Sequence, residues 1–327
     1  MSYFQPTTDP AAAIDVSGLE KTYAGSGRSG PKLALKGINL SIPRGSFFAL
    51  LGPNGAGKST FINILAGLVM KTAGTARVWG YDTDADMRAA RRCIGVVPQE
   101  LNLDPYFTPR EMLELQAGLY GLPESARRTD EVLEAVGLAD KADAYARSLS
   151  GGMRRRLLVG KAMVHSPPVL ILDEPSAGVD VDLRRQLWSH VQHLNSQGTT
   201  VLLTTHYLEE AEAMCDTIAI INHGQLIACE PTPDLLGRLD SKQLRITVDR
   251  ELDSVPATLS AYHAQLDEPN RLSVSFAPSR VTAGDVLGAV AAAGLTIGDV
   301  TTSEADLEDI FVSLTQADDA AGKEAAE

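Results

Sequence analysis

The chain has 327 residues, of which 44% are hydrophobic and 22% charged, enough for about two globular domains. Its 29 basic and 42 acidic residues give a formal net charge of −13, which argues against a nucleic-acid-binding face and against adhesion to anionic lipid. Three cysteines without metal-ligand spacing are typical of thiols in a reducing compartment. No apolar run reaches about 18 residues, and we see no secretion signal, so we expect a soluble cytoplasmic protein.

The N-terminal part predicts strands. Residues 1–12 are small and polar and are expected to be disordered, and Ala24 to Lys32 has the composition of a flexible loop. Residues 38–42 alternate between apolar and polar side chains, as a strand does. Phe47 to Leu51 is a continuous apolar run and predicts a strand that is buried on both faces.

A helical region then interrupts an alternation of strands and helices. Thr108 to Val164 lack strand signals, and Met112, Leu115 and Leu119 have helical spacing, so we expect a helical region at about residues 100–165. Strand-like runs on either side of this region lie at residues 94–97, 169–172, 200–204 and 218–221. This alternation predicts an α/β fold with a mostly parallel sheet that is covered on both faces.

The pattern changes near residues 231–240, so we divide the chain into residues 13–235 and a small α+β domain at residues 236–316. Leu307, Ile310, Phe311 and Leu314 form one apolar stripe of a closing helix. Residues 317–327 contain no apolar side chain larger than alanine and are expected to be disordered.

Residues 52–59 read GPNGAGKS, which matches the phosphate-loop pattern G-x-x-x-x-G-K-[ST] between a buried strand and a helix. The glycines allow backbone N–H groups to converge on phosphate oxygens, and the following helix directs its positive end at the same anion. Lys58 brings a charge to the outer phosphates, and the Ser59 hydroxyl can ligate Mg²⁺. A chance match in a turn is the alternative, and the strand–loop–helix context favours nucleotide binding instead.

Two carboxylates, Asp173 and Glu174, follow the four aliphatic residues 169–172. A buried strand that ends in Asp fits a second nucleotide motif, in which Asp173 holds Mg²⁺ through water beside Ser59. Glu174 would then polarise the attacking water as a general base. Two solvated acids at a strand end are the alternative, which the neighbouring phosphate loop disfavours.

Ser150, Gly151 and Gly152 precede another helical stretch, with Ser150 as a good N-cap. Their free N–H groups are not needed by a nucleotide held at residues 52–60, so we infer that they serve the nucleotide of another subunit. A simple helix start is the alternative. The following triplet, residues 154–156, consists of arginines, and we interpret it as a solvated helix face.

Four more residues are candidates for the site. His206 follows the strand at residues 200–204, where open α/β sheets bind ligands, and its imidazole can orient water or touch the terminal phosphate. Gln99 can reach Mg²⁺ or the water, and Tyr23 offers a ring to adenine. Asp180 lies six residues after Glu174, where it can touch a facing subunit.

This ordered set of motifs resembles the ATPase of ATP-binding cassette (ABC) transporters over about residues 13–230. The segments LSGGMRRR, LDEPSAGVD, LTTHYLEEAE and LEDIFVSLT resemble, more closely, the daunorubicin-resistance-like ATPases of type-2 ABC exporters. The resemblance implies a P-loop NTPase cassette with a mostly parallel core sheet, antiparallel N-terminal strands and a helical subdomain, followed by a small C-terminal α+β domain.

The resemblance also implies a role for each residue, with ATP and Mg²⁺ as cofactors. ATP is held by Tyr23 and by the loop residues Gly52, Pro53, Asn54, Gly55, Ala56, Gly57, Lys58, Ser59 and Thr60. Ser59 and Gln99 meet Mg²⁺, and Asp173 holds it through water. Glu174 is the catalytic base and His206 the switch. Ser150, Gly151 and Gly152 close on the partner's ATP, and Asp180 contacts the partner.

The implied partners are a second copy, in a head-to-tail dimer with ATP, and an integral membrane permease contacted by the helical region. The protein would then lie on the inner face of the cell membrane and bind no nucleic acid. Two residues depart from the common pattern: Met153 stands where many cassettes have Gln, and Ser176 where Thr is usual. What replaces the contacts of that Gln stays open.

Two other functions compete with export. A soluble ABC ATPase of translation or DNA repair usually has two cassettes, long heptad arms or cysteine-rich zinc modules, and the sequence has none of these. A nucleotide-gated binding module without turnover is disfavoured by the intact Glu174 and His206.

Overall fold

The computed structural model describes residues 12–25, 30–177, 181–238, 242–262, 264–276, 280–304 and 307–324. The chain divides into two compact units at Pro231 and Thr232, four residues before the predicted boundary, and each unit is described by itself. Most of the predicted disordered N-terminus and part of the predicted loop at residues 24–32 lie outside the described residues. Within the described ranges, no helix is both long and apolar enough to cross a membrane.

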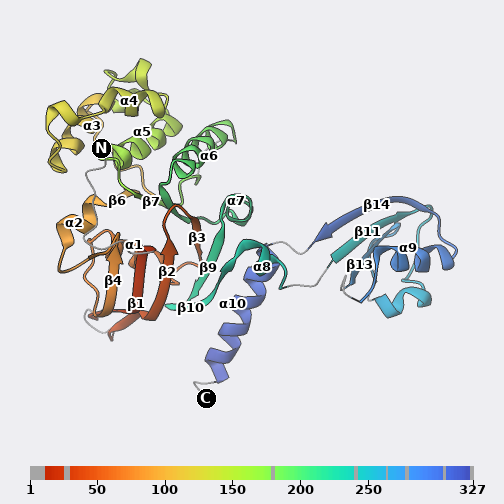
Figure 1. The fold of residues 1–327 in the computed structure, drawn as a ribbon. Coiled ribbons are helices and arrows are strands. Elements are labelled where there is room, and N and C mark those ends of the chain that lie inside the picture. Colours follow the sequence, from red (N-terminus) through yellow and green to blue (C-terminus); the bar gives the residue numbers. More distant parts are fainter. Residues whose placement is uncertain are drawn as a thin grey trace. The chain divides into compact units, whose positions relative to one another are not determined.

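The first unit is built on a six-stranded sheet of order β10-β9-β3-β8-β7-β6 (Figure 1). Its strands are β3 (Phe47–Leu51), β6 (Ile94–Val97), β7 (Val169–Asp173), β8 (Thr200–Thr204), β9 (Thr217–Asn222) and β10 (Gln225–Pro231). All neighbours pair in parallel except β9 and β10. Every residue of β3 and β8 is buried, because helices and a second sheet cover the two faces. The parallel pairing places the carboxyl ends of β3, β6, β7 and β8 at one edge.

A second, antiparallel sheet of order β2-β1-β4-β5 completes the core of this unit. Its strands are β1 (Ala12–Tyr23), β2 (Lys32–Pro43), β4 (Ala73–Val78) and β5 (Tyr81–Asp82). The alternation predicted at residues 38–42 is present, with Ile38, Leu40 and Ile42 buried. These side chains share one apolar cluster with Phe48 of the parallel sheet and Phe61 of α1, so α1 lies between the two sheets.

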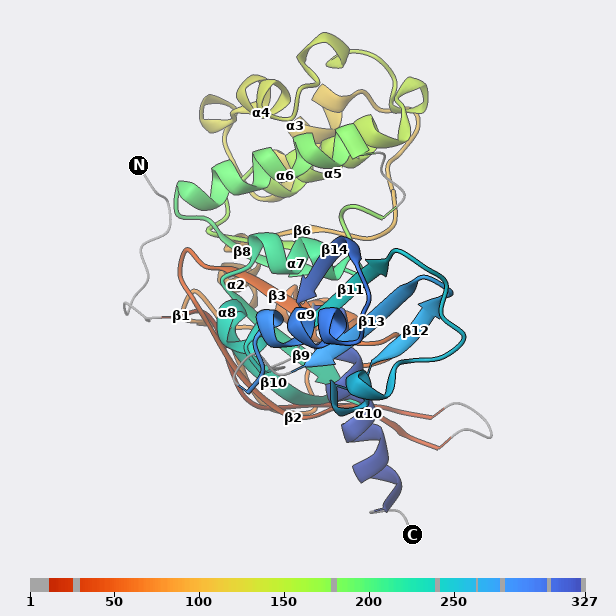
Figure 2. The same cartoon turned by 90° about the vertical axis from the view of Figure 1, so that its right-hand side faces the viewer.

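Helices connect the strands of the first unit. They are α1 (Lys58–Leu65), α2 (Met87–Arg92), α6 (Val181–Ser196) and α7 (Leu208–Met214). In Figure 2, α6 lies alongside α5 of the helical region, above the ends of β6 and β8.

The predicted helical region forms a subdomain with its own core at one end of this unit (Figure 1). It contains α3 (Pro109–Leu119), α4 (Thr129–Ala135) and α5 (Gly151–Met163), with short 3₁₀ turns η1 (Glu124–Ala126), η2 (Ala139–Lys141) and η3 (Ala146–Ser148). Thr108 and Glu111 make a reciprocal capping box at the start of α3, and Pro109 occupies the first helical position. Leu113, Leu133 and Leu157 hold the three helices together through this core.

The second unit contains an antiparallel sheet of order β12-β13-β11-β14. Its elements are α8 (Thr232–Leu236), β11 (Lys242–Val248), η4 (Ala257–Tyr262), β12 (Gln265–Glu268), β13 (Arg271–Phe276), α9 (Ala283–Ala292), β14 (Ile297–Glu304) and α10 (Leu307–Glu324). Val286 and Val290 of α9 are buried with Ile246 of β11, so α9 covers one face of this sheet. The predicted cassette fold with a C-terminal α+β domain is therefore confirmed.

The last helix is longer than expected. It continues to Glu324, eight residues beyond the predicted end at residue 316, so the chain is helical over residues 317–324 where we expected disorder. Eight of the eleven residues of the predicted tail are Ala, Glu or Lys, which are strong helix formers. A helix that has already begun at Leu307 extends through such residues at little cost.

Candidate active site

The residues predicted for nucleotide chemistry come together at the carboxyl edge of the parallel sheet. The phosphate loop follows β3, Gln99 follows β6, Asp173 ends β7, and His206 follows β8. A cavity of about 440 Å³ opens at this edge. It is lined by Tyr23, Lys32, Ala34, Asn54, Gly55, Ala56, Gly57, Lys58, Ser59, Thr60, Gln99, Glu174 and His206. The structure thus gathers, around one cavity, residues that are 183 positions apart in the chain (206 − 23).

The phosphate loop is shaped by close backbone packing. Gly57, the N-cap of α1, has a φ of 116°, and a Cβ there would lie 2.9 Å from the carbonyl oxygen of Ala34. A Cβ on Gly52 would lie 2.2 Å from the carbonyl oxygen of Ile221. No larger residue fits at either position, so these two glycines hold the loop open toward the cavity.

Lys58 is folded back on its own loop. Its Nζ donates to the carbonyl oxygen of Gly52 at 2.6 Å and to that of Pro53 at 3.2 Å. Burial lowers the pKa of Lys58, and the charges of Glu174 and Asp173 oppose this shift. The Lys58 ammonium therefore lines the cavity, and phosphate oxygens can replace its two carbonyl acceptors.

The Glu174 carboxylate is buried and held from two sides. Its Oε2 accepts from the Gln99 amide at 2.5 Å, and its Oε1 lies 2.5 Å from Nε2 of His206. Its backbone φ of 49° is uncommon for a residue with a side chain, and its N–H donates to the Thr204 carbonyl at 2.9 Å. Glu174 and His206, which sequence reasoning proposed separately, are thus in direct contact.

Known proteins resemble the chain closely. Residues 35–177 match the family described as ABC transporter. The chain is 36% identical to the daunorubicin/doxorubicin resistance ATP-binding protein of Streptomyces peucetius, over 98% of both chains. It is 37% identical to the linearmycin resistance ATP-binding protein of Bacillus subtilis (strain 168), over 92% of this chain and 98% of that one. The dimeric structure of a bacterial ABC transporter cassette superposes with a TM-score of 0.60 at 29% identity, over 67% of this chain and 98% of the cassette.

The chain is an ABC transporter ATP-binding protein. The family that the motifs resemble is therefore confirmed, as are its cassette fold and its class as an ABC ATPase that binds ATP.

The signature segment of this ABC ATPase, Ser150–Gly152, does not line the cavity of its own chain. Ser150 is the N-cap of α5, as expected, and its Oγ accepts from the Met153 N–H at 3.3 Å. Ser150 and Gly151 are exposed, and neither they nor Gly152 line the cavity. The Met153 side chain packs against the apolar core of the helical subdomain, so it adds packing where other cassettes have an amide. Asp180 lies outside the described residues.

The three arginines at residues 154–156 do not form a solvated face, so that expectation is wrong. Arg155 is only 3% exposed and donates to the carbonyl oxygens of Pro98, Gln99 and Glu174 at 2.8–3.0 Å. Arg155 shares the buried face of α5 with Leu158 and Ala162, at i, i+3 and i+7. This spacing was the signal that could have identified Arg155 as buried.

Arg154 and Arg156 also bond to main-chain carbonyls. Arg154 donates to Ala146 and Arg147, and Arg156 donates to Val136 and Gly137. All these acceptors belong to the helical subdomain, whereas the acceptors of Arg155 lie after β6 and β7 of the parallel sheet.

A buried carboxylate, Glu210 of α7, supports the carboxyl edge of the parallel sheet and was missed by sequence reasoning. Its Oε2 accepts from Ser176 at 2.8 Å and from Thr205 at 3.0 Å, and its Oε1 accepts from the Trp188 indole at 3.1 Å. Arg184 lies 3.7 Å away. Glu210 thus connects the loop after Glu174, the residue before His206, and α6.

Thr204, the last residue of β8, connects the two acids of the site. Its hydroxyl donates to Oδ1 of Asp173 and accepts from the N–H of Glu174 at 3.3 Å. A threonine at a strand end carries no special sequence signal, so this role emerges only when β7 and β8 pair.

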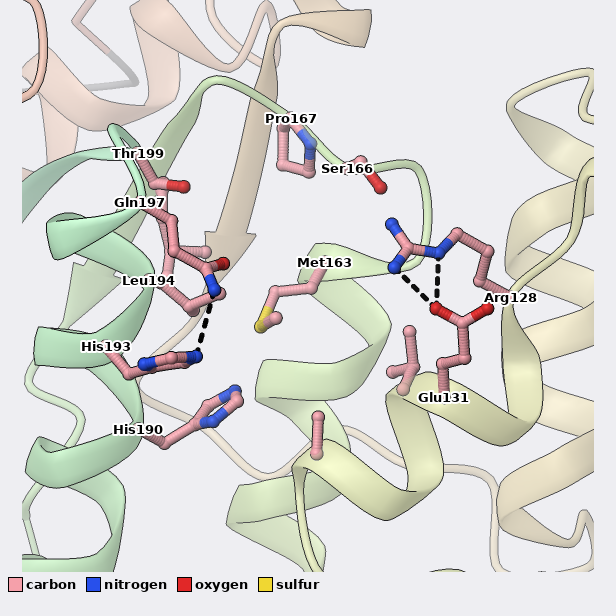
Figure 3. Close-up of a pocket in the computed structure, with 13 residues that line it drawn as sticks. Arg128, Glu131, Met163, Ser166, Pro167, His190, His193, Leu194, Gln197 and Thr199 are labelled. Carbon is pink, nitrogen blue, oxygen red and sulfur yellow. Dashed lines mark hydrogen bonds and ion pairs between the residues drawn. The ribbon is translucent and has the colours of Figure 1, made fainter. Parts of the chain in front are cut away.

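Further cavities lie in the same unit, and two of them are larger than 200 Å³. One, of about 560 Å³, is lined by β6, α3 and α5 and by the residues after α1, and its walls include Leu68, Leu119 and Tyr120. The other, of about 270 Å³, lies between α4, α5 and α6 (Figure 3). Around it, Arg128 pairs with Glu131 at 2.5 Å, and His193 bonds with Gln197 at 3.0 Å. His190 also lines this cavity, and its buried Nε2 has no hydrogen-bond partner among the described residues.

Proposed function

We propose that this ABC ATPase hydrolyses ATP at the edge of the parallel sheet and powers export through a separate membrane permease. The observation that carries the catalytic assignment is the buried Glu174 carboxylate between Gln99 and His206, beside the phosphate loop. Glu174 accepts a proton from the attacking water as the water oxygen bonds to the terminal phosphorus and the bond to ADP breaks. His206 orients the water and the terminal phosphate.

The rest of the cavity holds the nucleotide. The ring of Tyr23, whose hydroxyl lies 3.4 Å from Oγ1 of Thr60, stacks on adenine. The backbone N–H groups of residues 52–60, Pro53 excepted, bind the phosphates. On binding, phosphate oxygens replace the carbonyl partners of Lys58. The contact between Gln99 and Glu174 opens as the water enters.

The donor set around the cavity supports Mg²⁺ as cofactor. The Ser59 hydroxyl, the Gln99 amide oxygen and the Asp173 carboxylate are oxygen donors, the type that Mg²⁺ prefers. Among the described residues, no group of three His, Cys, Asp or Glu side chains could hold a metal by itself. The three oxygen ligands fit an Mg²⁺ ion whose remaining ligands are substrate phosphates and water. The ion would then neutralise the charge of the phosphates.

We further propose that two copies bind two ATP molecules head to tail. The exposed position of Ser150 and Gly151, outside the cavity of their own chain, supports their use by the partner's ATP. The dimeric structure of the similar cassette supports a dimer. Asp180 stays a proposed contact between the copies.

The cavity of about 560 Å³ lined by β6, α3, α5 and the residues after α1 forms a groove, which is the proposed contact with the permease. Leu68 and Leu119 on its wall are 72% and 75% exposed, and Met70 nearby is 69% exposed. Exposed apolar side chains around a groove mark a protein-binding surface. The two relatives named for drug resistance support outward transport, which places this chain on the inner face of the cell membrane through its permease.

Two substitutions test the catalytic assignment. Lys58→Ala is expected to weaken ATP binding, because the phosphates lose their buried cation. Glu174→Gln is expected to keep ATP binding but arrest turnover in a closed dimer. The measurements are ATP affinity, phosphate release and dimer formation on size exclusion with ATP. Wild-type phosphate release by Glu174→Gln would contradict the assigned base.

The permease contact is tested on α3. Leu119→Glu is expected to abolish co-purification with the permease from membranes, while ATP binding by the free chain stays unchanged. Leu115→Glu is the matched control, because Leu115 is 54% exposed on the same helix but does not line the groove. Equal retention of the permease by both variants would exclude this groove as the contact.

A further inference from the structure

Arg155 makes hydrogen bonds that the catalytic roles assigned above do not use. Its guanidinium is buried, and its three hydrogen bonds all go to main-chain carbonyl oxygens. Nη1 donates to Pro98 at 2.8 Å and to Gln99 at 2.9 Å, and Nη2 donates to Glu174 at 3.0 Å. Desolvation lowers the pKa of Arg155, opposed by the charges of Asp173 and Glu174, and the guanidinium stays charged.

These carbonyls belong to two separate parts of the catalytic edge. Pro98 and Gln99 follow β6, and the Gln99 side chain bonds to the Glu174 carboxylate. The third acceptor is the carbonyl of Glu174 itself, whose left-handed backbone depends on its surroundings. The same guanidinium therefore holds both partners of the Gln99–Glu174 contact by their backbones.

Arg155 also lies close in the chain to the signature segment. Arg155 lies four residues after Gly151, the first residue of α5, so it sits about one helical turn from Ser150–Gly152. A hydrogen-bonded turn transmits a displacement of the helix start directly to Arg155. A movement of the signature segment therefore shifts the backbones of Gln99 and Glu174, which Arg155 holds.

We propose that Arg155 is a positioning residue that couples the two ATP sites of the dimer. This inference rests on the proposed head-to-tail dimer and on Glu174 as the base. When Ser150–Gly152 close on the partner's ATP, Arg155 carries the movement to the general base of its own chain. ATP in one site thus prepares the base for the other. The planar fork of arginine is needed, because its fixed donors span the three acceptors while a lysine ammonium is a single point charge.

Arg156 provides a matched control. It is the next residue of the same helix and also donates from one nitrogen to two carbonyl oxygens, those of Val136 at 3.0 Å and Gly137 at 2.9 Å. Both acceptors lie inside the helical subdomain. Arg156→Lys therefore perturbs the same helix to a similar extent without loosening the backbones of Gln99 and Glu174.

The experiment compares Arg155→Lys with Arg156→Lys in the full chain. For Arg155→Lys we expect kcat to fall about tenfold or more, since misplacement of about 1 Å can cost a hundredfold, while half-saturating ATP changes less than about twofold. The Hill coefficient for ATP falls toward one. Amide hydrogen exchange rises in segments 97–102 and 172–177. Arg156→Lys keeps the wild-type kcat, Hill coefficient and exchange in these segments.

Three outcomes overturn the proposal: wild-type kcat and Hill coefficient in Arg155→Lys, unchanged exchange in both segments, or an equal loss of kcat in Arg156→Lys. If Arg155→Lys does not fold, as judged by circular dichroism, Arg155→Gln carries the same expectations. Glu174→Gln in the same assays distinguishes a failure of the coupling from a failure of Glu174 as the base. Turnover by Glu174→Gln would overturn the assigned base, whereas an arrested Glu174→Gln beside a normal Arg155→Lys would overturn the coupling alone.

Discussion

Replacement of Glu210 is predicted to destabilise the first unit strongly. In Glu210→Ala, the hydroxyls of Ser176 and Thr205 and the indole N–H of Trp188 lose a buried acceptor. Each unsatisfied buried donor costs about 1–3 kcal/mol, and the hydroxyls can rotate toward other acceptors, so we expect a total of about 3–5 kcal/mol. Glu210→Gln keeps one acceptor oxygen for the two hydroxyls but places a donor NH2 opposite the Trp188 indole N–H, so its expected cost is about 1–3 kcal/mol.

The assay is urea unfolding followed by the fluorescence of Trp188. The sequence has two tryptophans, so a Trp79→Phe background leaves Trp188 as the single reporter, and it bonds directly to Glu210. Glu209→Ala is the control, because Glu209 is exposed and its loss should change the free energy of unfolding by less than about 0.5 kcal/mol. If Glu210→Ala lies within about 1 kcal/mol of this control, the buried acceptor contributes far less than the contacts indicate.

Two further predictions concern His165 and Tyr23. Burial lowers the pKa of His165 to about 4, and its ring stacks on Tyr120 with the centroids 3.6 Å apart. The unfolded state therefore takes up a proton first as pH falls from about 6.5 to 4, and the free energy of unfolding drops by up to about 3 kcal/mol. Unfolding of His165→Gln should depend less steeply on pH in this window, and equal slopes would refute the assignment. Tyr23→Ala should weaken ATP binding by about 1–3 kcal/mol in a titration while Tyr23→Phe binds normally, and equal affinities would remove the stacking role.

The catalytic edge was predictable because its signals are local. The phosphate loop has a strict spacing, and Asp173 and Glu174 directly follow a run of aliphatic residues. Parallel strands then bring Gln99 and His206 to the same edge without further information. The contacts of Glu174 with Gln99 and His206 follow from this topology.

The supporting contacts were not predictable in the same way. Arg155 and Glu210 carry charges, which favour solvent in the absence of partners, and their partners are distant carbonyls and hydroxyls. Thr204 acts only through strand pairing with Asp173. The extension of α10 to Glu324 depends on propagation from an existing helix, which composition alone does not reveal.

The most direct test of the head-to-tail arrangement mixes two inactive variants. Lys58→Ala disables the phosphate loop, and Gly151→Asp places a negative charge at the signature segment. Gly151→Asp is expected to leave the fold intact, because a Cβ on Gly151 meets nothing within 4 Å. In a hybrid dimer, the intact loop of the Gly151→Asp copy faces the intact signature of the Lys58→Ala copy.

The measurement is phosphate release by each variant alone and by their equimolar mixture. If the signature segment serves the partner's ATP, the mixture releases phosphate faster than the mean of the two variants and reaches at most about a quarter of wild-type turnover, because half of the dimers are hybrids with one complete site. The proposed coupling through Arg155 lowers this ceiling, because the copy that holds the intact phosphate loop carries the altered signature segment. If each signature segment serves the ATP of its own chain, neither copy of the hybrid holds a complete site. The mixture would then release phosphate no faster than the mean of the two variants, which would contradict the account.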